Sequence, residues 1–360
     1  MKAAVFHGPH QPLTIETIEL DEPMSHEVVV KVMASGVCHS DLHFVDGLYP
    51  MTAPTILGHE GAGIVEKVGD QVTYVSPGDH VIMCLSVFCG HCERCMSGEP
   101  WLCRNPEVRV RPGKKPKYTW NGNPVGQFAN LSTYAEKTLV HENTLVKMRD
   151  DMPFDTAALI GCGVTTGVGA AMNTAKVAPG STVAVFGAGG VGLSCIQGAR
   201  IAGARQIIAV DIHESKLATA RELGATHIVD ASSGDPVAKI LEMVPGGVDY
   251  AFECIGLKVA AEQAFGAIRA GGTATIVGMI PIGQNLELPG SVFLSEKKLQ
   301  GSSMGSNRFR IHMPQYIELY KQGRLKLDEM VSRKGRLEDV NEAFRAMKAG
   351  EVARTVLMMD

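Results

Sequence analysis

The chain has 360 residues, of which 45% are hydrophobic and 20% charged, so it is long enough for two globular domains with sizeable cores. Its 34 basic and 38 acidic residues give a formal net charge of −4, which argues against a nucleic-acid scaffold or a polybasic membrane binder. The unusual features are 40 glycines and 9 cysteines. Because the cysteine count is odd and the chain is too long to depend on disulfides, we expect metal or redox chemistry.

The N-terminal segment predicts no export signal. Only four apolar residues lie between Lys2 and His7, too few for a secretory core. The longest apolar run, 183–193, is interrupted by glycines and is shorter than the roughly 18 residues that span a bilayer. We therefore expect a cytoplasmic protein with no membrane partner, whose reduced, clustered cysteines are candidate metal ligands.

The N-terminal part of the chain, up to about residue 150, predicts short strands separated by turns. Runs rich in β-formers cover 27–32, 62–68 and 79–83, and proline and glycine recur between them. This texture predicts a compact, mostly antiparallel β domain.

From residue 181 the pattern changes to strands that alternate with helices. Five apolar runs have the length of buried strands: 182–186, 206–210, 227–229, 248–252 and 273–277. Four segments of helical periodicity lie between them: 191–202, 214–223, 236–243 and 258–268. This alternation predicts βαβ units and a parallel sheet, with 298–301 as a sixth strand. We expect the tail, with helices at 313–321 and 337–348 and a strand at 355–358, to return to the first domain.

A glycine-rich loop joins the first of these strands to its helix. Its sequence, Gly187-Ala188-Gly189-Gly190-Val191-Gly192, has the G-x-G-x-x-G pattern that lets the backbone turn tightly and approach a pyrophosphate. The second strand ends in Asp211, 19 residues beyond Gly192. A carboxylate there accepts hydrogen bonds from ribose hydroxyls and repels a 2′-phosphate. The sequence therefore predicts dinucleotide binding, with NAD favoured over NADP.

Four cysteines form a second motif: Cys89, Cys92, Cys95 and Cys103. Tight C-x2-C turns direct thiolates to one centre, and four cysteines close a tetrahedral zinc site with no open position. An iron–sulfur cluster is the alternative, but the bacterial ferredoxin spacing places the fourth cysteine sooner and follows it with proline. We therefore expect a structural zinc.

A run of basic residues follows this motif, with Glu107 as the one acid among them: Arg104, Arg109, Arg111, Lys114, Lys115 and Lys117. Charge runs are usually solvated, so we expect an exposed loop. The alternative is a rim that attracts an anion to a substrate cleft.

Three further segments, 36–43, 58–63 and 161–167, combine glycine with residues that bind metals or move protons. Taken singly, each has a structural explanation, since a buried cysteine packs as a small hydrophobe. Together with the cysteine motif and the glycine loop, they resemble the zinc-dependent alcohol dehydrogenases of the medium-chain dehydrogenase/reductase family over essentially the whole chain. The segment Gly58-His59-Glu60-Gly61 is among the most specific parts of this resemblance.

The resemblance implies an α/β fold of two domains. A GroES-like, β-rich catalytic domain would comprise 1–163 and 304–360, with a structural zinc lobe at 86–104. A Rossmann domain with a doubly wound, six-stranded parallel sheet would be inserted at 164–303. Catalysis is expected in the cleft between them.

The resemblance also implies the ligands of a catalytic zinc, Cys38, His59 and Cys162, the two-cysteine, one-histidine set of alcohol dehydrogenase. Glu60 matches an acid that approaches the zinc, and Asp41 a carboxylate that orients the histidine ligand. Ser40 and His43 resemble a relay that takes the alcohol proton through the cofactor ribose to solvent. Besides the glycine loop and Asp211, the expected cofactor contacts are His39, Lys216 and Arg354.

The implied activity is NAD-dependent interconversion of alcohols and aldehydes or ketones, with two zinc ions per chain. Tyr49, Leu85 and Phe128 are expected near an apolar substrate slot. The expected partners are a small-molecule substrate and a second copy of the chain, in a homodimer rather than a homotetramer. One alternative is a formaldehyde dehydrogenase of the same family that depends on glutathione or mycothiol. A more remote alternative, a non-catalytic NAD-binding protein, is disfavoured because all three catalytic ligands are present.

Overall fold

The structure, a computed structural model, describes residues 1–359 and divides into two compact units. The first unit comprises Met1–Cys162, Arg308–Gly323 and the tail from Leu327. The second unit comprises Gly163–Asn307 and Arg324–Lys326. The predicted inserted domain, 164–303, falls inside the second unit.

The first unit is built on two sheets, and most of its strand pairs are antiparallel, as predicted. One sheet has the order β2 (Thr14–Thr17), β1 (Lys2–Phe6), β5 (Thr55–Ile56), β9 (Asn123–Gln127), β8 (Tyr118–Trp120) and β3 (Glu19–Leu20). The other has the order β11 (Leu145–Lys147), β7 (His80–Met83), β6 (Glu60–Val68), β4 (Glu27–Gly36), β19 (Thr355–Met358) and β18 (Arg333–Arg336), and β10 (Lys137–His141) also pairs with β4.

Strand β4 organises this second sheet because β6, β10 and β19 all pair with it. It continues four residues beyond the predicted run, to Gly36, and is buried along most of its length. The final strand β19 pairs antiparallel with the end of β4, Val356 opposite Gly36, which confirms that the tail returns to the first unit. The tail helix α9 (Phe309–Lys321) covers the first predicted helical pattern, and a 3-10 turn (Leu337–Asp339) followed by α10 (Val340–Lys348) covers the second.

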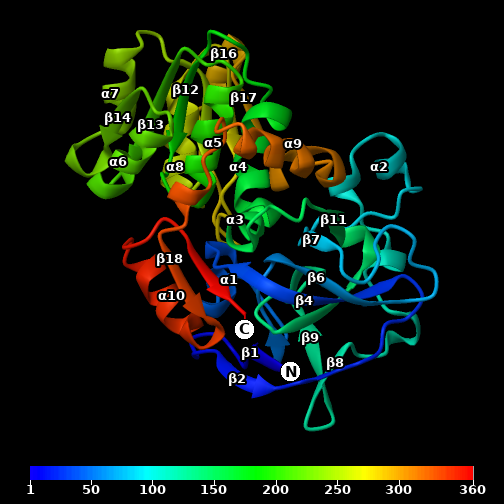
Figure 1. The fold of residues 1–360 in the computed structure, drawn as a ribbon. Helices are drawn as coiled ribbons and strands as arrows, with labels where there is room; N and C mark the ends of the chain where they lie inside the picture. Colours follow the sequence, from blue (N-terminus) through cyan, green and yellow to red (C-terminus); the bar gives the residue numbers. More distant parts are fainter. Residues whose placement is uncertain (360) are drawn as a thin grey trace. The chain divides into compact units, whose positions relative to one another are not determined.

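The second unit contains one parallel sheet flanked by helices (Figure 1). Its strand order is β14 (His227–Asp230), β13 (Gln206–Asp211), β12 (Thr182–Phe186), β15 (Val248–Glu253), β16 (Ile268–Ile276) and β17 (Lys298–Gly301). Helices α5 (Gly190–Ile201) and α6 (Glu214–Leu223) pack on each other, and so do α7 (Pro236–Met243) and α8 (Lys258–Ala267). This order confirms the predicted doubly wound, six-stranded sheet.

A helical segment that the sequence pattern did not predict runs from 154 to 174. It consists of α3 (Phe154–Leu159), a π-helical turn (Ile160–Val164), α4 (Thr165–Gly169) and a second π-helical turn (Ala170–Thr174). Its length and apolar composition would suffice to cross a membrane, but 94% of its most apolar stretch is buried inside the protein. Burial on all sides explains its apolar composition without a bilayer.

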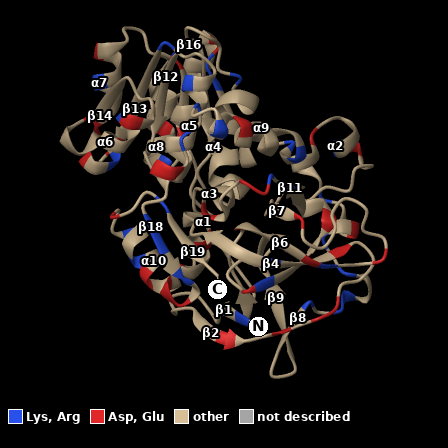
Figure 2. Ribbon diagram, viewed as in Figure 1, with Lys and Arg blue, Asp and Glu red and all other residues tan. Residues whose placement is uncertain are grey.

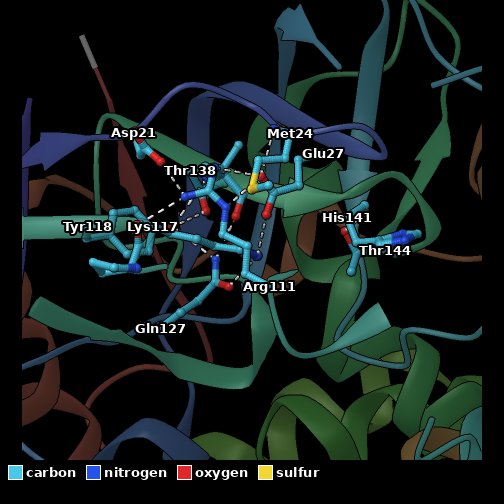
Figure 3. A network of polar contacts seen from close by, with 12 residues as sticks. Asp21, Met24, Glu27, Arg111, Lys117, Tyr118, Gln127, Thr138, His141 and Thr144 are labelled. Atoms are coloured by element: carbon cyan, nitrogen blue, oxygen red, sulfur yellow. Dashed lines mark hydrogen bonds and ion pairs between the residues drawn. The ribbon is translucent and has the colours of Figure 1, made fainter. Parts of the chain in front are cut away.

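The basic segment after the cysteine motif is exposed only in part. Acidic and basic residues are interspersed along the ribbon (Figure 2), and here they meet inside the protein. Arg111 is buried and donates to Asp21 and Glu27, and the Lys117 ammonium donates to Gln127 Oε1 at 2.9 Å (Figure 3). Arg111 therefore anchors the segment through ion pairs with Asp21, which follows β3, and with Glu27 on β4. Arg104, Lys114 and Lys115 are exposed, as expected of a solvated loop.

Candidate metal and nucleotide sites

The four-cysteine motif forms a compact cluster of sulfurs. Sγ–Sγ distances are 3.5 Å for Cys92–Cys95, 3.8 Å for Cys92–Cys103 and 3.9 Å for Cys89–Cys95. A tetrahedron with Zn–S bonds of about 2.3 Å has edges of about 3.8 Å. The cysteines are not paired in disulfides. The donor set therefore fits one tetrahedral zinc ion.

Local geometry explains why these four side chains converge. Gly90 has φ +87, which turns the chain sharply after Cys89. Cys92 precedes the single helical turn α2 (Glu93–Met96), and its N–H donates to the Cys89 sulfur at 3.3 Å. The carbonyl of Cys103 accepts hydrogen bonds from Arg109 at 2.8 Å and Arg104 at 3.4 Å. His91 is exposed, as expected of a histidine that is surplus to the site.

A second cluster is made by Cys38, His59, Glu60 and Cys162, whose ligand atoms lie within 4.8 Å of one another and are all buried. Gly36 at the end of β4 pairs with Glu60 at the start of β6, so the segments that carry Cys38 and His59 meet at one edge of the sheet. Cys162 comes from the π-helical turn Ile160–Val164. Such turns often occur at functional sites because they redirect a side chain within a helix.

The electrostatics of this cluster suit a soft divalent metal. Hydrogen bonds to Cys162 and His59 hold the pKa of the Cys38 thiol well below its usual range. Burial alone would raise this pKa, but the hydrogen bonds outweigh it. Burial lowers the pKa of His59, but the Asp41 carboxylate and Cys38 outweigh it and raise this pKa to about 10. Cys38 therefore offers a thiolate, and metal binding would displace a proton from the His59 imidazolium, as expected for a cysteine–histidine zinc site.

Asp41 holds the imidazole of His59 in place. Its Oδ1 accepts from His59 Nδ1 at 3.2 Å and from the Gly58 N–H at 3.0 Å. With Nδ1 engaged, Nε2 is left to face the sulfurs. The Asp41 Oδ2 atom accepts from the Tyr134 hydroxyl at 3.0 Å. Sequence reasoning missed Tyr134, which lies 93 residues from Asp41 along the chain.

Glu60 and Arg354 form a buried ion pair within the first unit. Strand β19 begins directly after Arg354 and pairs with the end of β4. This pairing places the Arg354 guanidinium next to the Glu60 carboxylate. A Cβ on Gly36 would lie 2.2 Å from Glu60 Oε2, so glycine is required where this pair packs against β4. Arg354 thus neutralises the acid of the metal cluster, and its contact with a cofactor phosphate stays a prediction.

The predicted relay residues lie on α1 (His39–Val45), the helix that begins after Cys38. His39 is exposed, whereas Ser40 and His43 are half-buried. Ser40 Oγ lies 3.6 Å from Cys38 Sγ. His43 Nδ1 is buried and lacks a hydrogen-bond partner among residues 1–359, and burial lowers the pKa of this ring. The neutral form of His43 is therefore favoured near pH 7.

Aromatic rings line one side of the metal cluster. The ring of Phe128 packs edge-on to His59 at 5.6 Å between centroids, and Phe44 packs on Phe128 at 5.0 Å. Tyr49 lies 5.8 Å from Phe44 and 6.0 Å from His43. All three residues predicted near a substrate slot are half-buried, and Phe128 and Leu85 pack against one hydrophobic core, whereas Tyr49 contacts Phe44 and His43. Phe44 was not predicted, because a lone aromatic residue on a short helix carries no local signal.

The glycine loop in the second unit has the shape of a phosphate cradle. Gly187 has φ +95, and a Cβ on Gly192 would lie 1.7 Å from the Gly187 carbonyl oxygen, so both positions require glycine. A Cβ on Gly189, by contrast, would meet nothing within 4 Å in the described chain. Gly189 is the N-cap of the twelve-residue helix α5, and no described side chain caps that end. Open space over uncapped N–H groups fits a bound phosphate.

Asp211 lies beside this loop, as predicted. Its Oδ2 accepts from the Ala188 N–H at 2.8 Å and its Oδ1 from the His213 N–H at 3.0 Å. These bonds fix the carboxylate at the end of β13, next to the glycine loop after β12. Lys216 lies in the first turn of α6 and is half-buried.

Comparisons with known proteins agree with this geometry. A family model described as the alcohol dehydrogenase GroES-like domain matches residues 24–150, and one described as zinc-binding dehydrogenase matches residues 190–322. An alcohol dehydrogenase zinc-binding domain protein from Burkholderia ambifaria is 37% identical, with a TM-score of 0.95 over 100% of this chain and 98% of that one. Benzyl alcohol dehydrogenase from Acinetobacter calcoaceticus is 34% identical, with a TM-score of 0.94 over 100% and 99%.

A more distant structural relative was solved with a nucleotide bound. It is a zinc-binding dehydrogenase from Sinorhizobium meliloti 1021 bound to NADP, 28% identical, with a TM-score of 0.83 over 99% of this chain and 98% of that one. Together, the matches confirm the predicted fold class, a GroES-like domain with a Rossmann-like nucleotide-binding domain.

Proposed function

The chain belongs to the zinc-binding alcohol dehydrogenases of the medium-chain dehydrogenase/reductase family, and on that basis we propose that it interconverts alcohols and aldehydes or ketones with NAD(H) as hydride carrier. The observation that carries the proposal is the buried cluster of Cys38, His59 and Cys162. Glu60, the fourth donor of this cluster, is held by its ion pair with Arg354, so three ligands remain for the metal. Three protein ligands are the mark of a catalytic rather than a structural zinc, since one coordination position remains for substrate.

The chain's own residues have distinct tasks in this reaction. A zinc ion held by Cys38, His59 and Cys162 supplies Lewis acidity, which lowers the pKa of an alcohol hydroxyl as it does that of water. We propose that Ser40 Oγ takes the substrate proton and that His43 delivers it to solvent. Replacing His43 by Ala should slow turnover at low pH, and unchanged rates there would contradict its role.

NAD rather than NADP is proposed as the cofactor because of Asp211. Its carboxylate is fixed next to the glycine loop, where it would repel a 2′-phosphate. The NADP-bound relative shows that the family also accommodates the other nucleotide. Asp211→Gly should raise kcat/KM for NADP relative to NAD. An unchanged preference would contradict the role of Asp211.

We further propose that the substrate is an alcohol with an apolar, preferably aromatic, substituent. Support comes from the rings of Phe44, Tyr49 and Phe128 next to His59 and from the similarity to benzyl alcohol dehydrogenase. A panel of aromatic, primary, secondary and polyol substrates, read by NADH formation, tests activity and class together. No NADH from any member would contradict the proposed activity. A preference for polyols would contradict the substrate class alone.

Metal analysis tests the site assignment independently of substrate. We propose a catalytic and a structural zinc, so about two zinc ions per chain should be found. Replacing Cys162 by Ser should remove about one zinc and the activity, whereas the four-cysteine site should keep its metal.

The thiol-dependent formaldehyde dehydrogenase has less support than the proposed function. Its support from the sequence was a basic rim for an anionic adduct, but Arg111, Lys115 and Lys117 are neutralised by Asp21 and Glu27. Formaldehyde oxidation that requires glutathione or mycothiol would restore this alternative.

A homodimer in the cytoplasm is the proposed setting. Strand β17 is an edge of the parallel sheet, and the segment before it exposes Ile282, Phe293 and Leu294, with 65%, 45% and 91% of their surface accessible. An exposed edge beside apolar side chains suits pairing with a second copy. The low net charge supports the expectation that nucleic acids and membranes are not partners.

A further inference from the structure

The buried hydroxyl of Tyr134 lies at the end of a chain of hydrogen bonds that reaches the metal cluster. It donates to Asp41 Oδ2 at 3.0 Å. The other oxygen, Oδ1, accepts from the Gly58 N–H at 3.0 Å, and His59 Nδ1 lies 3.2 Å from both carboxylate oxygens. Tyr134, Asp41 and His59 are each no more than 1% exposed. Water therefore has little access to replace any member of this chain.

The backbone fixes the position of Tyr134 relative to His59. The Tyr134 N–H donates to the Leu57 carbonyl at 3.1 Å, and the preceding N–H, that of Thr133, donates to the Gly58 carbonyl at 2.9 Å. The two segments thus run side by side immediately before the histidine. A Cβ on Gly58 would lie 2.6 Å from the Tyr134 ring, so the packing is close as well as hydrogen-bonded.

The hydroxyl completes the hydrogen bonding of the Asp41 carboxylate. Without it, Oδ2 would keep only its 3.2 Å contact with His59 Nδ1, and a buried carboxylate oxygen that loses a donor is unfavourable. The carboxylate would then be free to rotate or shift, and the imidazole bound to Oδ1 would follow it. Burial and the Asp41 charge raise the pKa of Tyr134 well above its usual value, so the hydroxyl remains a donor.

We propose that Tyr134 is a positioning residue for the catalytic metal: through Asp41 it sets the orientation of His59 and so strengthens zinc binding by Cys38, His59 and Cys162. The inference rests on the proposed function, since it assumes that this cluster binds zinc. Outer-shell partners of metal-binding histidines typically change metal affinity 10–100-fold when they are mutated.

Tyr134→Phe removes only the hydroxyl and keeps the buried ring, which packs on Phe344 at 6.3 Å. In the full-length zinc enzyme, competition with a chelator should show about 10–100-fold weaker binding of the catalytic zinc. The four-cysteine site should be unaffected. In protein with cobalt(II) at the catalytic site, the visible spectrum should shift, because that spectrum reports ligand geometry rather than stability.

Tyr118→Phe is the matched control. Tyr118 is also fully buried in the first unit, and its hydroxyl contacts Thr138 at 2.8 Å and Gln127 at 3.0 Å, away from the metal ligands. This variant should lose stability yet keep wild-type zinc affinity and the wild-type cobalt spectrum. Equal loss of zinc in both variants would overturn the proposal, because it would show a general effect of destabilisation.

A second comparison tests whether Tyr134 acts through Asp41. In an Asp41→Asn background the additional Tyr134→Phe change should leave zinc affinity unchanged within about twofold, since the chain of hydrogen bonds from Tyr134 to His59 is already disrupted. A further tenfold loss there would overturn the proposal. If Tyr134→Phe alone does not fold, the double variant can be measured instead, because Asp41→Asn removes the buried charge that the Tyr134 hydroxyl contacts.

Two failures remain distinguishable. If Tyr134→Phe keeps wild-type zinc affinity and spectrum, the role of Tyr134 is wrong while the proposed function stands. If the wild-type protein binds zinc only at the four cysteines, the proposed function itself fails.

Discussion

Arg111 is a charged residue whose role is structural. Its guanidinium donates to Asp21, to Glu27 Oε2 at 3.1 Å and to the Pro116 carbonyl at 3.1 Å, and its side chain is 3% exposed. Because both acids lie on or next to β3 and β4, the pairs tie the segment after the cysteine motif to the sheets. A buried pair of this kind is costly to break on one side only.

Replacing Arg111 by Met should therefore destabilise the protein strongly. The change leaves the buried Glu27 carboxylate without its main partner, so we expect the free energy of unfolding to fall by about 3–5 kcal/mol. Denaturant unfolding measures this loss. Lys114→Met, at an exposed position in the same basic segment, should change stability by less than about 0.5 kcal/mol. Equal effects would mean that the ion pairs do not anchor the segment.

His141 should make stability depend on pH. Burial and the neighbouring His26 ring, stacked at 5.7 Å, lower its pKa to about 4 from an ordinary value of 6.5. Between these values the unfolded chain binds a proton that the folded chain does not, so the free energy of unfolding falls as the pH drops from 6.5 to 4. We expect His141 to contribute about 1–2 kcal/mol, less than the full shift implies because the ring is partly accessible.

Unfolding of wild type and His141→Gln at pH 7 and pH 5 measures this contribution. The two proteins share all zinc ligands, so metal release at low pH affects both. The variant should lose less stability between the two pH values. The same loss in both proteins would show that another group titrates.

Residues whose role depends on local spacing were predictable, and those that act across the fold were not. Cys89, Cys92, Cys95 and Cys103 are recognised because short turns bring close neighbours together. Cys38 and His59 are separated along the chain, and only a family resemblance linked them before the pairing of β4 with β6 was known. Tyr134 has no local motif. Its contact with Asp41 depends on the register of distant segments, which one sequence does not encode visibly.

At the scale of elements, periodicity predicted the second unit well. The bounds of α6, α7 and β12 agree with the predicted ranges because each has a clear apolar pattern between turn residues. The segment 154–174 was missed because it is apolar on all sides and lacks an amphipathic stripe. The π-helical turn that carries Cys162 was missed with it.

The glycine loop allows a prediction with an internal comparison. At Gly189 a Cβ would enter open space, so Gly189→Ala should fold normally but weaken nucleotide binding at least tenfold by filling the cradle. At Gly192 a Cβ would collide with the Gly187 carbonyl, so Gly192→Ala should also lower the melting temperature. Fluorescence titration with NADH and thermal unfolding measure the two effects.

Gly266→Ala is the control for these substitutions. Gly266 lies within α8, where a Cβ would make ordinary contact with Val237 at 3.7 Å. Alanine there should leave nucleotide affinity unchanged and preserve or raise stability. If Gly189→Ala binds NADH as tightly as this control, the phosphate does not occupy the space over Gly189.

At the scale of the whole molecule, charge and apolar surface point to self-association rather than to polyanionic partners. The net charge of −4 gives little long-range attraction to nucleic acids. The second unit exposes three large apolar side chains shortly before its edge strand β17, and Leu294 is the most exposed of them. Edge strands of monomeric proteins are usually protected by charges, by proline or by covering elements.

A dimer through β17 should therefore be sensitive to charge at this edge. Leu294→Lys places an ammonium group at a side chain that is 91% exposed, so folding of the monomer should not suffer. We expect wild type to sediment as a dimer and Leu294→Lys to shift toward monomer at micromolar concentration, with zinc content unchanged. Ile311→Lys, on α9 of the first unit and 54% exposed, should remain dimeric. The expected effect follows from the burial of apolar surface, which would drive association at this edge. A Leu294→Lys protein that stays dimeric would place the interface elsewhere. A monomeric wild type would exclude the dimer.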